Sequence, residues 1–318
     1  MTNYQPPWVL FNRHIETVYP ALLRKVSNVA YQRERIYTTD GDFLDLDWVP
    51  RGSRKLVIIS HGLEGNTQRA YIKGMAKAFV QQGFDALAWN YRGCSEEINR
   101  QLRFYHSGAT DDLDAVIQHA APRYEQVFLV GFSLGGNLTL KYVGERGSQV
   151  HPKIKKAVAF SVPIDLHTSC LQISRPENWL YTKRFLNSLE KKVVAKSRAM
   201  SGLDLSHFST IKTLMDFDEY YTAPLHGFAG AIDYYQRCSA LQFLGNIAIP
   251  TLLVNAQNDP FLSKECFPTK INNPNFTFES PARGGHVGFS LFGNRGRFWS
   301  ELRAVDFVTA SPFKNTNA

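Results

Sequence analysis

The nonapeptide VFLVGFSLG, residues 127–135, joins an apolar run to a serine that has glycine at both second neighbours. The pattern G-x-S-x-G, at the end of a predicted strand and the start of a helical stretch, is typical of a nucleophile elbow. Glycine suits positions 131 and 135 because larger side chains would collide in so tight a turn. We therefore expect an exposed hydroxyl on a strained backbone at Ser133. The pentapeptide also arises by chance, in which case Ser133 only caps the helix.

Apolar runs bounded by turn residues alternate with helix-like stretches on both sides of Ser133. The predicted strands are 55–60, 85–90, 127–131, 157–162, 251–256 and 275–279. The predicted helices are 71–82, 111–121, 134–145 and 297–307. Ahead of them, segments 35–39 and 43–49 flank Asp40-Gly41, which indicates a β-hairpin. Continuous apolar strands joined by helices predict an α/β fold with a mostly parallel central sheet flanked by helices.

The alternation breaks after Pro163. Residues 165–245 are basic and aromatic and carry no strand signals, which predicts a helical cap, or lid, inserted into the fold. The resulting division has an N-terminal segment (1–34), a core domain (35–164 and 246–318) and the cap.

The length of 318 residues suits one large α/β domain with an insertion. No stretch is apolar for the eighteen or so residues that span a bilayer, and the N-terminus lacks the pattern of a secretory signal. The four cysteines, Cys94, Cys170, Cys238 and Cys266, show no C-x-x-C spacing, which argues against a zinc site or a disulfide framework. We therefore expect reduced thiols and a cytoplasmic protein.

The formal net charge is +8, yet the Lys and Arg residues are spread widely and form no nucleic-acid-binding motif. We expect no nucleic-acid partner and no stable insertion into a membrane. The basic residues are densest in segment 175–198, which is either a solvated helical face or a surface that attracts anionic lipid or an acidic substrate. The sequence does not fix the oligomeric state.

A serine hydroxyl needs a neighbouring base and a group that orients this base before it attacks a carbonyl. For this architecture the expected chain order is Ser, Asp or Glu, His. Asp259 follows a predicted apolar strand, and His286 lies in a glycine-rich loop after the last strand. Asp165 competes for the acid position, but the polar loop around Asp259 favours the latter. The predicted triad is therefore Ser133, Asp259 and His286.

The tetrahedral intermediate of acyl transfer places negative charge on the former carbonyl oxygen, so two backbone N–H groups should point at it. One is predicted to belong to Leu134, the residue after the serine, at the N-terminus of a helix. The second is expected from the glycine-containing loop after strand 55–60, where the amide of Leu63 is the candidate. His61 would then shape this loop and not act as a base.

These residues together resemble the α/β-hydrolase superfamily and, more narrowly, the YheT-like esterase branch with its eukaryotic lipase and acyltransferase relatives. The resemblance spans nearly the whole chain. Its marks are HGLEG (61–65), NYRGC (90–94), GFSLGGN (131–137), APLHGF (223–228) and DPF (259–261). The segment NRHIET (12–17) is similar to the N-x-H-x-Q-T pattern of that branch, with Glu16 where glutamine is usual.

The resemblance implies a serine carboxylesterase that hydrolyses short- or medium-chain acyl esters without a cofactor or a metal, beneath a cap. One alternative is an acyltransferase, because His106 and Asp111 have the H-x-x-x-x-D spacing of such enzymes. Thr110 and the acids after it equally make an ordinary helix start. A second alternative is a hydrolase-fold protein that binds a ligand without catalysis.

Overall fold

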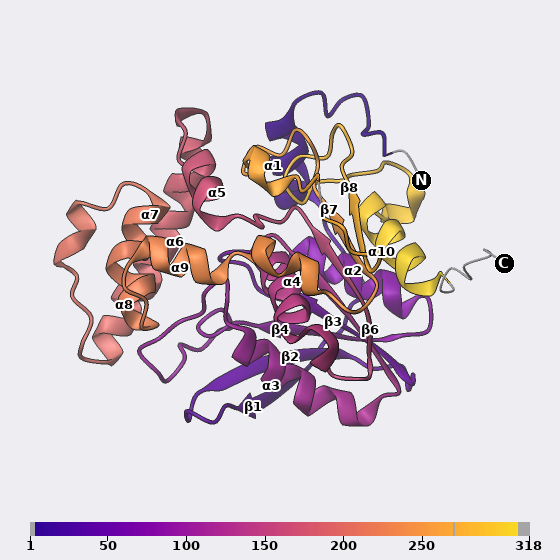
Figure 1. Cartoon of the computed structure of the whole chain (residues 1–318), viewed down its shortest axis with the longest axis horizontal. Coiled ribbons are helices and arrows are strands. Elements are labelled where there is room, and N and C mark those ends of the chain that lie inside the picture. The colour runs from indigo at the N-terminus through magenta and orange to yellow at the C-terminus, as the bar shows by residue number, and fades with distance from the viewer. Residues whose placement is uncertain (1–3, 270, 311–318) are drawn as a thin grey trace.

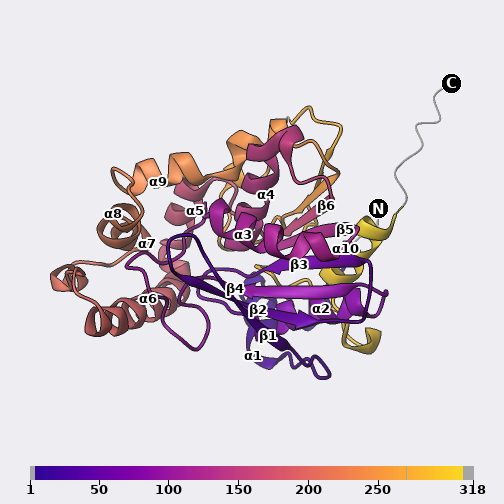
Figure 2. The same cartoon turned by 90° about the horizontal axis from the view of Figure 1, so that it is seen from below.

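A computed structural model describes residues 4–269 and 271–310, and within them one eight-stranded sheet has the order β1-β2-β4-β3-β5-β6-β7-β8. The strands are β1 (Gln32–Tyr37), β2 (Phe43–Val49), β3 (Lys55–Ser60), β4 (Asp85–Asn90), β5 (Gln126–Phe132), β6 (Ile154–Phe160), β7 (Thr251–Val254) and β8 (Phe276–Glu279). β2 pairs antiparallel with β1 and β4, and all other pairs are parallel. The predicted mostly parallel sheet is confirmed (Figures 1 and 2).

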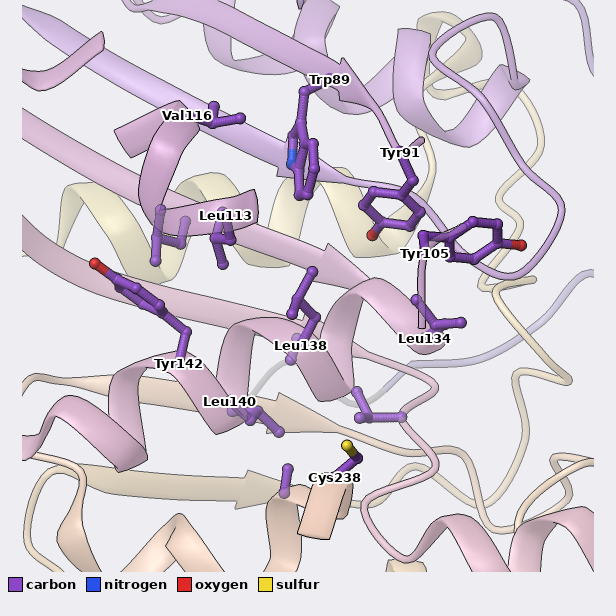
Figure 3. Packing of buried hydrophobic residues seen from close by; sticks show 14 of the residues in the cluster. Trp89, Tyr91, Tyr105, Leu113, Val116, Leu134, Leu138, Leu140, Tyr142 and Cys238 are labelled. Carbon is purple, nitrogen blue, oxygen red and sulfur yellow. The ribbon is translucent and has the colours of Figure 1, made fainter. Parts of the chain in front are cut away.

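Helices cover both faces of this sheet. They are α1 (Arg13–Leu23), α2 (Ala70–Val80), α3 (Thr110–Ala120), α4 (Leu134–Arg146), α5 (Leu166–Ile173), α6 (Trp179–Ala199), α7 (Leu214–Phe217), α8 (Ala223–Leu225), α9 (Ala231–Cys238) and α10 (Trp299–Thr309). Successive side chains of β3 point to opposite faces of the sheet. Leu56 and Ile58 pack with α3 and α4 on one face, and Val57 and Ile59 pack with α2 and α10 on the other. Figure 3 shows part of the first cluster, where Leu138 of α4 lies near Trp89 of β4.

The element boundaries differ from the predicted ones by a few residues in several places. Strands 55–60 and 85–90 have the predicted bounds, whereas the first hairpin strand begins and ends earlier than expected. Helix α1 was not among the predicted elements. Its sequence contains Pro20, which removes a backbone donor in the interior of a helix and is therefore a breaker signal, although the Asn12 side chain caps the first turn.

Strand β1 forms one edge of the sheet and carries charged side chains. Arg33 and Arg35 lie directly opposite Asp47 and Asp45 of β2 in the strand register. Each guanidinium forms two hydrogen bonds with its carboxylate; for Arg35 these are 2.7 and 2.9 Å long. Such bidentate pairs fix the orientation of both side chains.

Helices α5 to α9 follow β6 and precede β7, inside the segment predicted as a cap. Figure 1 shows α6 to α9 gathered to one side of the sheet, away from β8 and α10. A turn of π-helix, Asp218–Thr222, joins α7 to α8. Among the described residues, no helix combines the length and the apolar character needed to cross a bilayer.

Candidate active site

Ser133 occupies the junction between β5 and α4. Its φ of 53° and ψ of −121° lie outside the regions that residues with a side chain ordinarily adopt. A Cβ at Gly131 would overlap the carbonyl group of Gly135, and a Cβ at Gly135 would overlap the carbonyl oxygens of Ser60 and His61. The overlap between Gly131 and Gly135 is the collision that the sequence predicted. Gly135 is required for a different reason, because the end of β3 and the loop after it lie against it. This close approach holds the serine in the predicted sharp turn.

The three predicted triad side chains meet in space. The Nε2 atom of His286 lies 3.0 Å from Oγ of Ser133, and its Nδ1 atom lies 2.9 Å from Oδ2 of Asp259. The Asp259 side chain is fully buried, and its Oδ1 accepts a hydrogen bond from the amide of Phe261 at 2.9 Å. An imidazole with Nδ1–H directed at a carboxylate leaves Nε2 free to accept the serine proton. The arrangement therefore has the geometry of a general base beside a nucleophile.

Asp165, the competing acid in the sequence, has a structural environment instead. It is the N-cap of α5, and its Oδ1 accepts hydrogen bonds from the amide and hydroxyl of Thr168 at 3.0 and 2.8 Å. Among the described residues, no hydrogen bond connects Asp165 with His286. Asp259 is thus the acid that the fold brings to the histidine.

The two residues predicted to form the oxyanion hole lie beside the serine. The loop after β3 approaches Ser133 so closely that a Cβ at Gly62 would lie 3.1 Å from the Cβ of Ser133. Leu63 and Leu134 both line the cavity that contains Ser133 and His286. Within the described residues, neither of these amides donates to a protein acceptor.

His61 lies at the base of this loop and is fully buried. Its Nδ1 lies 2.8 Å from the carbonyl oxygen of Gly62, and its ring packs against Tyr91 at a centroid distance of 3.9 Å. Burial lowers the pKa of His61 to about 3, because the charged imidazole loses its hydration. These contacts agree with a neutral residue that shapes the loop.

Two cavities meet at Ser133 and His286. The first, here called the cap cavity, lies beneath the segment predicted as a cap and is mostly apolar. Its apolar lining includes Leu166, Ile173, Leu189, Val193, Leu214 and Phe217. The second, here called the N-terminal cavity, lies between α1 and α6 and is lined by residues such as Val18, Leu22, Arg69, Tyr181 and Arg184. A molecule bound at Ser133 can therefore extend in two directions.

His106 also lines the cap cavity, but it does not pair with Asp111. Its ring packs against His226 at a centroid distance of 4.6 Å, and Asp111 instead accepts hydrogen bonds from Arg103. Burial, reinforced by the charge of His226, lowers the pKa of His106 well below its ordinary value. The hydroxyl of Thr110 does not cap α3: Thr110 is the first helical residue, and its Oγ1 donates to Glu145.

Comparison with known proteins shows the family to which the chain belongs. The family described as "Serine aminopeptidase, S33" matches residues 51–266, which is more than half of the chain. The protein YheT of Escherichia coli K12 is 31% identical over 310 residues, covering 94% of this chain and 90% of that protein. The chain belongs to the α/β-hydrolases, in the YheT-like branch. This hydrolase is also 31% identical to phospholipase ABHD3 of Mus musculus, over 91% of this chain and 73% of that protein.

Solved structures support the same fold. An esterase of Pyrococcus furiosus, Pf2001, superposes with a TM-score of 0.59 over 90% of this chain and 95% of its own. The two sequences are 18% identical, so the likeness concerns the fold alone. This hydrolase therefore has the architecture of known esterases, and its sheet and flanking helices are those of the α/β-hydrolase fold.

The N-terminal segment of this hydrolase contacts the loops that carry the triad, which sequence reasoning did not foresee. Oε2 of the buried Glu16 accepts hydrogen bonds from the side chain of Asn258 at 2.7 Å and from the amide of Gly284 at 3.0 Å. Oγ1 of Thr17 accepts from the amide of His286 at 2.9 Å. The motif at 12–17 was the available signal, but a motif does not reveal which distant loop it contacts.

Proposed function

We propose that this hydrolase cleaves short- to medium-chain carboxylic acyl esters through a covalent acyl-enzyme. The observation that carries the proposal is the row of hydrogen bonds from Ser133 through His286 to Asp259, located where two cavities meet. Relatives that bear the names esterase and monoacylglycerol lipase support ester hydrolysis as the class of reaction. The apolar cap cavity suits an acyl chain, and the N-terminal cavity suits the alcohol part.

The reaction follows from the positions of the side chains. His286 takes the proton of Ser133 as Oγ attacks the ester carbonyl carbon, and Asp259 keeps the imidazole in the required tautomer. The amides of Leu63 and Leu134 stabilise the oxyanion. When the bond to the alcohol breaks, His286 returns the proton to the leaving alkoxide. Water then attacks the acyl-enzyme by the same route and releases the carboxylic acid.

Hydrolysis of p-nitrophenyl esters with two to sixteen acyl carbons tests the proposal. We expect Ser133→Ala to lower kcat/KM by at least about 10³-fold and to abolish labelling by a fluorophosphonate. Asp259→Asn should lower kcat by about 10²- to 10⁴-fold, because the imidazole loses the required tautomer. Asp165→Asn is the matched control, since asparagine also caps a helix, and should leave the rate near wild type. Hydrolysis that persists in Ser133→Ala contradicts the proposal.

Acyl transfer is the competing outcome, because an alcohol can replace water in the second half of the reaction. Product analysis with a medium-chain acyl donor and ethanol separates the two activities. We expect the free acid to dominate. A dominant ethyl ester would instead assign an acyltransferase.

We also propose that segment 165–245 functions as a cap and that its rim makes peripheral contact with lipid. Trp179 and Leu180 of α6 are exposed by 56% and 63%, and the basic Lys183 and Arg184 follow one turn later on the same helix. Leu22 of α1, which is 66% exposed, lines the same cavity as Arg184. Apolar side chains flanked by cations are typical of surfaces that rest on anionic bilayers. Leu22 and Arg184 also line the N-terminal cavity, so this rim borders a route to Ser133.

Sedimentation with vesicles measures this contact. We expect binding to vesicles that contain phosphatidylglycerol, weaker binding to pure phosphatidylcholine, and loss of binding in the double variant Trp179→Glu, Leu180→Glu. Tyr37→Glu, at an equally exposed site on β1, is the control and should bind as the wild type does. Equal sedimentation of both variants with anionic vesicles would refute the rim contact.

A cytoplasmic location is part of the proposal. It is supported by Cys94, Cys170, Cys238 and Cys266, which are buried and unpaired within the described part of the chain. Reduced thiols are typical of a reducing compartment. Fractionation of the native host, with detection by a fluorophosphonate probe, tests this location.

A further inference from the structure

Glu64 directly follows Leu63 and has an unusual backbone conformation. Its φ is 51°, in the left-handed region that residues with a Cβ rarely adopt. Its side chain is nevertheless only 6% exposed. A strained and buried residue beside a proposed oxyanion donor persists only when its surroundings hold it in place.

Three side chains hold the Glu64 carboxylate. Oε1 lies 2.7 Å from Nζ of Lys192 and accepts a hydrogen bond from the Tyr105 hydroxyl at 2.8 Å. Oε2 accepts from the Ser188 hydroxyl at 2.6 Å. The Tyr105 oxygen in turn accepts from the amide of Glu64 at 2.8 Å. The loop after β3 is thus fixed through both the side chain and the backbone of Glu64.

Two of these partners come from the segment proposed as a cap. Ser188 and Lys192 are one helical turn apart on α6, so they project from one face of that helix. Ser188 lines the N-terminal cavity and Lys192 lines the cap cavity. The contact with Glu64 therefore lies where α6 passes between the two cavities.

The pair is charged over a wide pH range. Burial alone would raise the pKa of Glu64, but the charge of Lys192 and the hydrogen bonds outweigh it and lower the pKa. Burial also opposes the charge of Lys192, yet Cys94 and Glu64 raise its pKa above the ordinary value. Removing either partner leaves a buried and unpaired charge, which is costly.

We propose that Glu64 is a positioning residue, through which helix α6 holds the amide of Leu63 toward the oxygen of the tetrahedral intermediate. The inference rests on the proposed function, because it assigns a role within that reaction. Glu64 borders the N-terminal cavity, but both oxygens of its carboxylate are held by protein side chains, so its role is exerted through the loop. The position of α6 and the stabilisation of the oxyanion are therefore coupled. If α6 were displaced, the enzyme would still bind the ester but would hydrolyse it slowly.

The test compares turnover with binding of a mimic of the tetrahedral intermediate. We expect Glu64→Gln and Lys192→Met to lower kcat for a p-nitrophenyl ester by about 10- to 100-fold, below the loss from removing an oxyanion donor outright. KM should change by less than about 3-fold, because each variant alters a single side chain and leaves the apolar lining of both cavities in place. The inhibition constant of an alkylboronic acid, which forms a tetrahedral adduct with serine, should rise by the same factor as kcat/KM falls.

Matched variants separate positioning from general damage to the fold. Lys191→Met removes a charge from the exposed neighbouring position of α6 and should retain wild-type kcat and inhibition. The double variant Glu64→Gln, Lys192→Met should lose less than the product of the single losses, because both act through one contact. Ser188→Ala removes one hydrogen bond and should give a smaller loss of the same kind. Thermal melting shows which variants fold.

The outcomes are distinct. Wild-type kcat and boronic acid inhibition in folded Glu64→Gln would overturn the inference. If Glu64→Gln does not fold, the same result in Ser188→Ala and Lys192→Met would overturn it. A proportional loss of kcat and of boronic acid affinity, with KM nearly unchanged, supports it. If the wild-type protein hydrolyses no ester and takes no fluorophosphonate label, the proposed function itself has failed.

Discussion

At the scale of single residues, sequence and structure agree on the side chains that meet at the candidate site. Ser133, Asp259 and His286 were identified from the chain order and the loop positions, and the fold brings them within hydrogen-bonding distance. The role of Glu16 escaped prediction because its partners are more than 240 residues away. Patterns along a chain report local geometry, whereas such contacts depend on packing.

Glu16 gives a prediction at this scale. We expect Glu16→Ala to lower kcat/KM by about 10-fold or more, because the loops around Asn258 and Gly284 lose a shared acceptor near the reacting groups. It should also remove the carboxylate that lies 2.6 Å from Nη2 of Arg283, so that this guanidinium keeps only the carbonyl oxygen of Leu10. Glu16→Gln keeps an amide oxygen as acceptor and should retain most activity. Steady-state kinetics and thermal melting measure both effects.

An exposed pair is the control for Glu16. Glu177 forms an ion pair with Arg13 at 3.3 Å near the surface, where such pairs contribute little. Glu177→Gln should therefore change neither kcat/KM nor the melting temperature noticeably. A Glu16→Ala variant with the kinetics of Glu177→Gln would show that the N-terminal segment has no influence on the site.

At the scale of elements, periodicity identified the core and failed in the cap. The strands of the parallel sheet have continuous apolar runs, so their existence was predictable. Helices α7 and α8 have only four and three residues, too few for a periodic signal. The segment was therefore predicted as helical without individual bounds. Short helices are specified by tertiary packing, which a local pattern does not contain.

The turn between β5 and α4 gives a prediction at this scale. In Gly135→Ala the new methyl group would overlap the carbonyl oxygens of Ser60 and His61, both backbone atoms that cannot rotate away. We expect lower thermal stability and a loss of esterase activity of about 10-fold or more, since a small displacement of the nucleophile is costly. Esterase assays and melting curves on the purified variant check this.

Gly245→Ala is the matched substitution, because nothing lies within 4 Å of the Cβ position at Gly245. It should keep wild-type activity and melting temperature. If Gly135→Ala behaved in the same way, the tight approach of α4 to the loop after β3 would not be required for function.

At the scale of the whole molecule, the fold class was predictable and the division of the site into two cavities was not. The N-terminal cavity combines Val18 with Tyr181, and the cap cavity combines Leu63 with Leu214. These residues come from distant parts of the chain, and their arrangement depends on how α1 and α6 pack. The shape of the cavities, and with it the choice of ester, is a property of the assembled molecule.

Buried histidines predict how acid affects the whole fold. Burial lowers the pKa values of His61, His106 and His226, so these groups take up protons on unfolding as the pH falls below about 6.5. The contribution of these histidines to folding stability is complete above the pKa of an ordinary histidine. It is lost as the pH falls toward their lower pKa values in the folded protein. Each such group lowers the free energy of unfolding by about 1.4 kcal/mol per pH unit. Asp218 offsets part of this, since burial raises its pKa to about 6.

Urea unfolding between pH 8 and pH 4.5 measures this loss. We expect the free energy of unfolding to decrease already from pH 8 to pH 7, because burial lowers the pKa of Lys196 to about 7, and to decrease more steeply below about pH 6.5, where the histidines titrate. His106→Gln should reduce the number of protons taken up on unfolding by about one, because glutamine does not titrate. The slope of the unfolding free energy against pH should decrease accordingly. Equal slopes for the wild type and His106→Gln would mean that His106 is protonated as easily in the folded protein as in the unfolded chain.

The charged edge strand has a consequence for how copies of the chain meet. The outer strand of a sheet offers unpaired backbone groups on which another chain can build. On β1 the guanidinium groups of Arg33 and Arg35 are hydrogen-bonded to Asp47 and Asp45 of β2. A strand that approached this edge would therefore contact charged side chains with fixed positions. Extending the sheet at this border would require dehydrating these ions. Concentrated solutions of the protein should thus resist growth of intermolecular β-structure from this side.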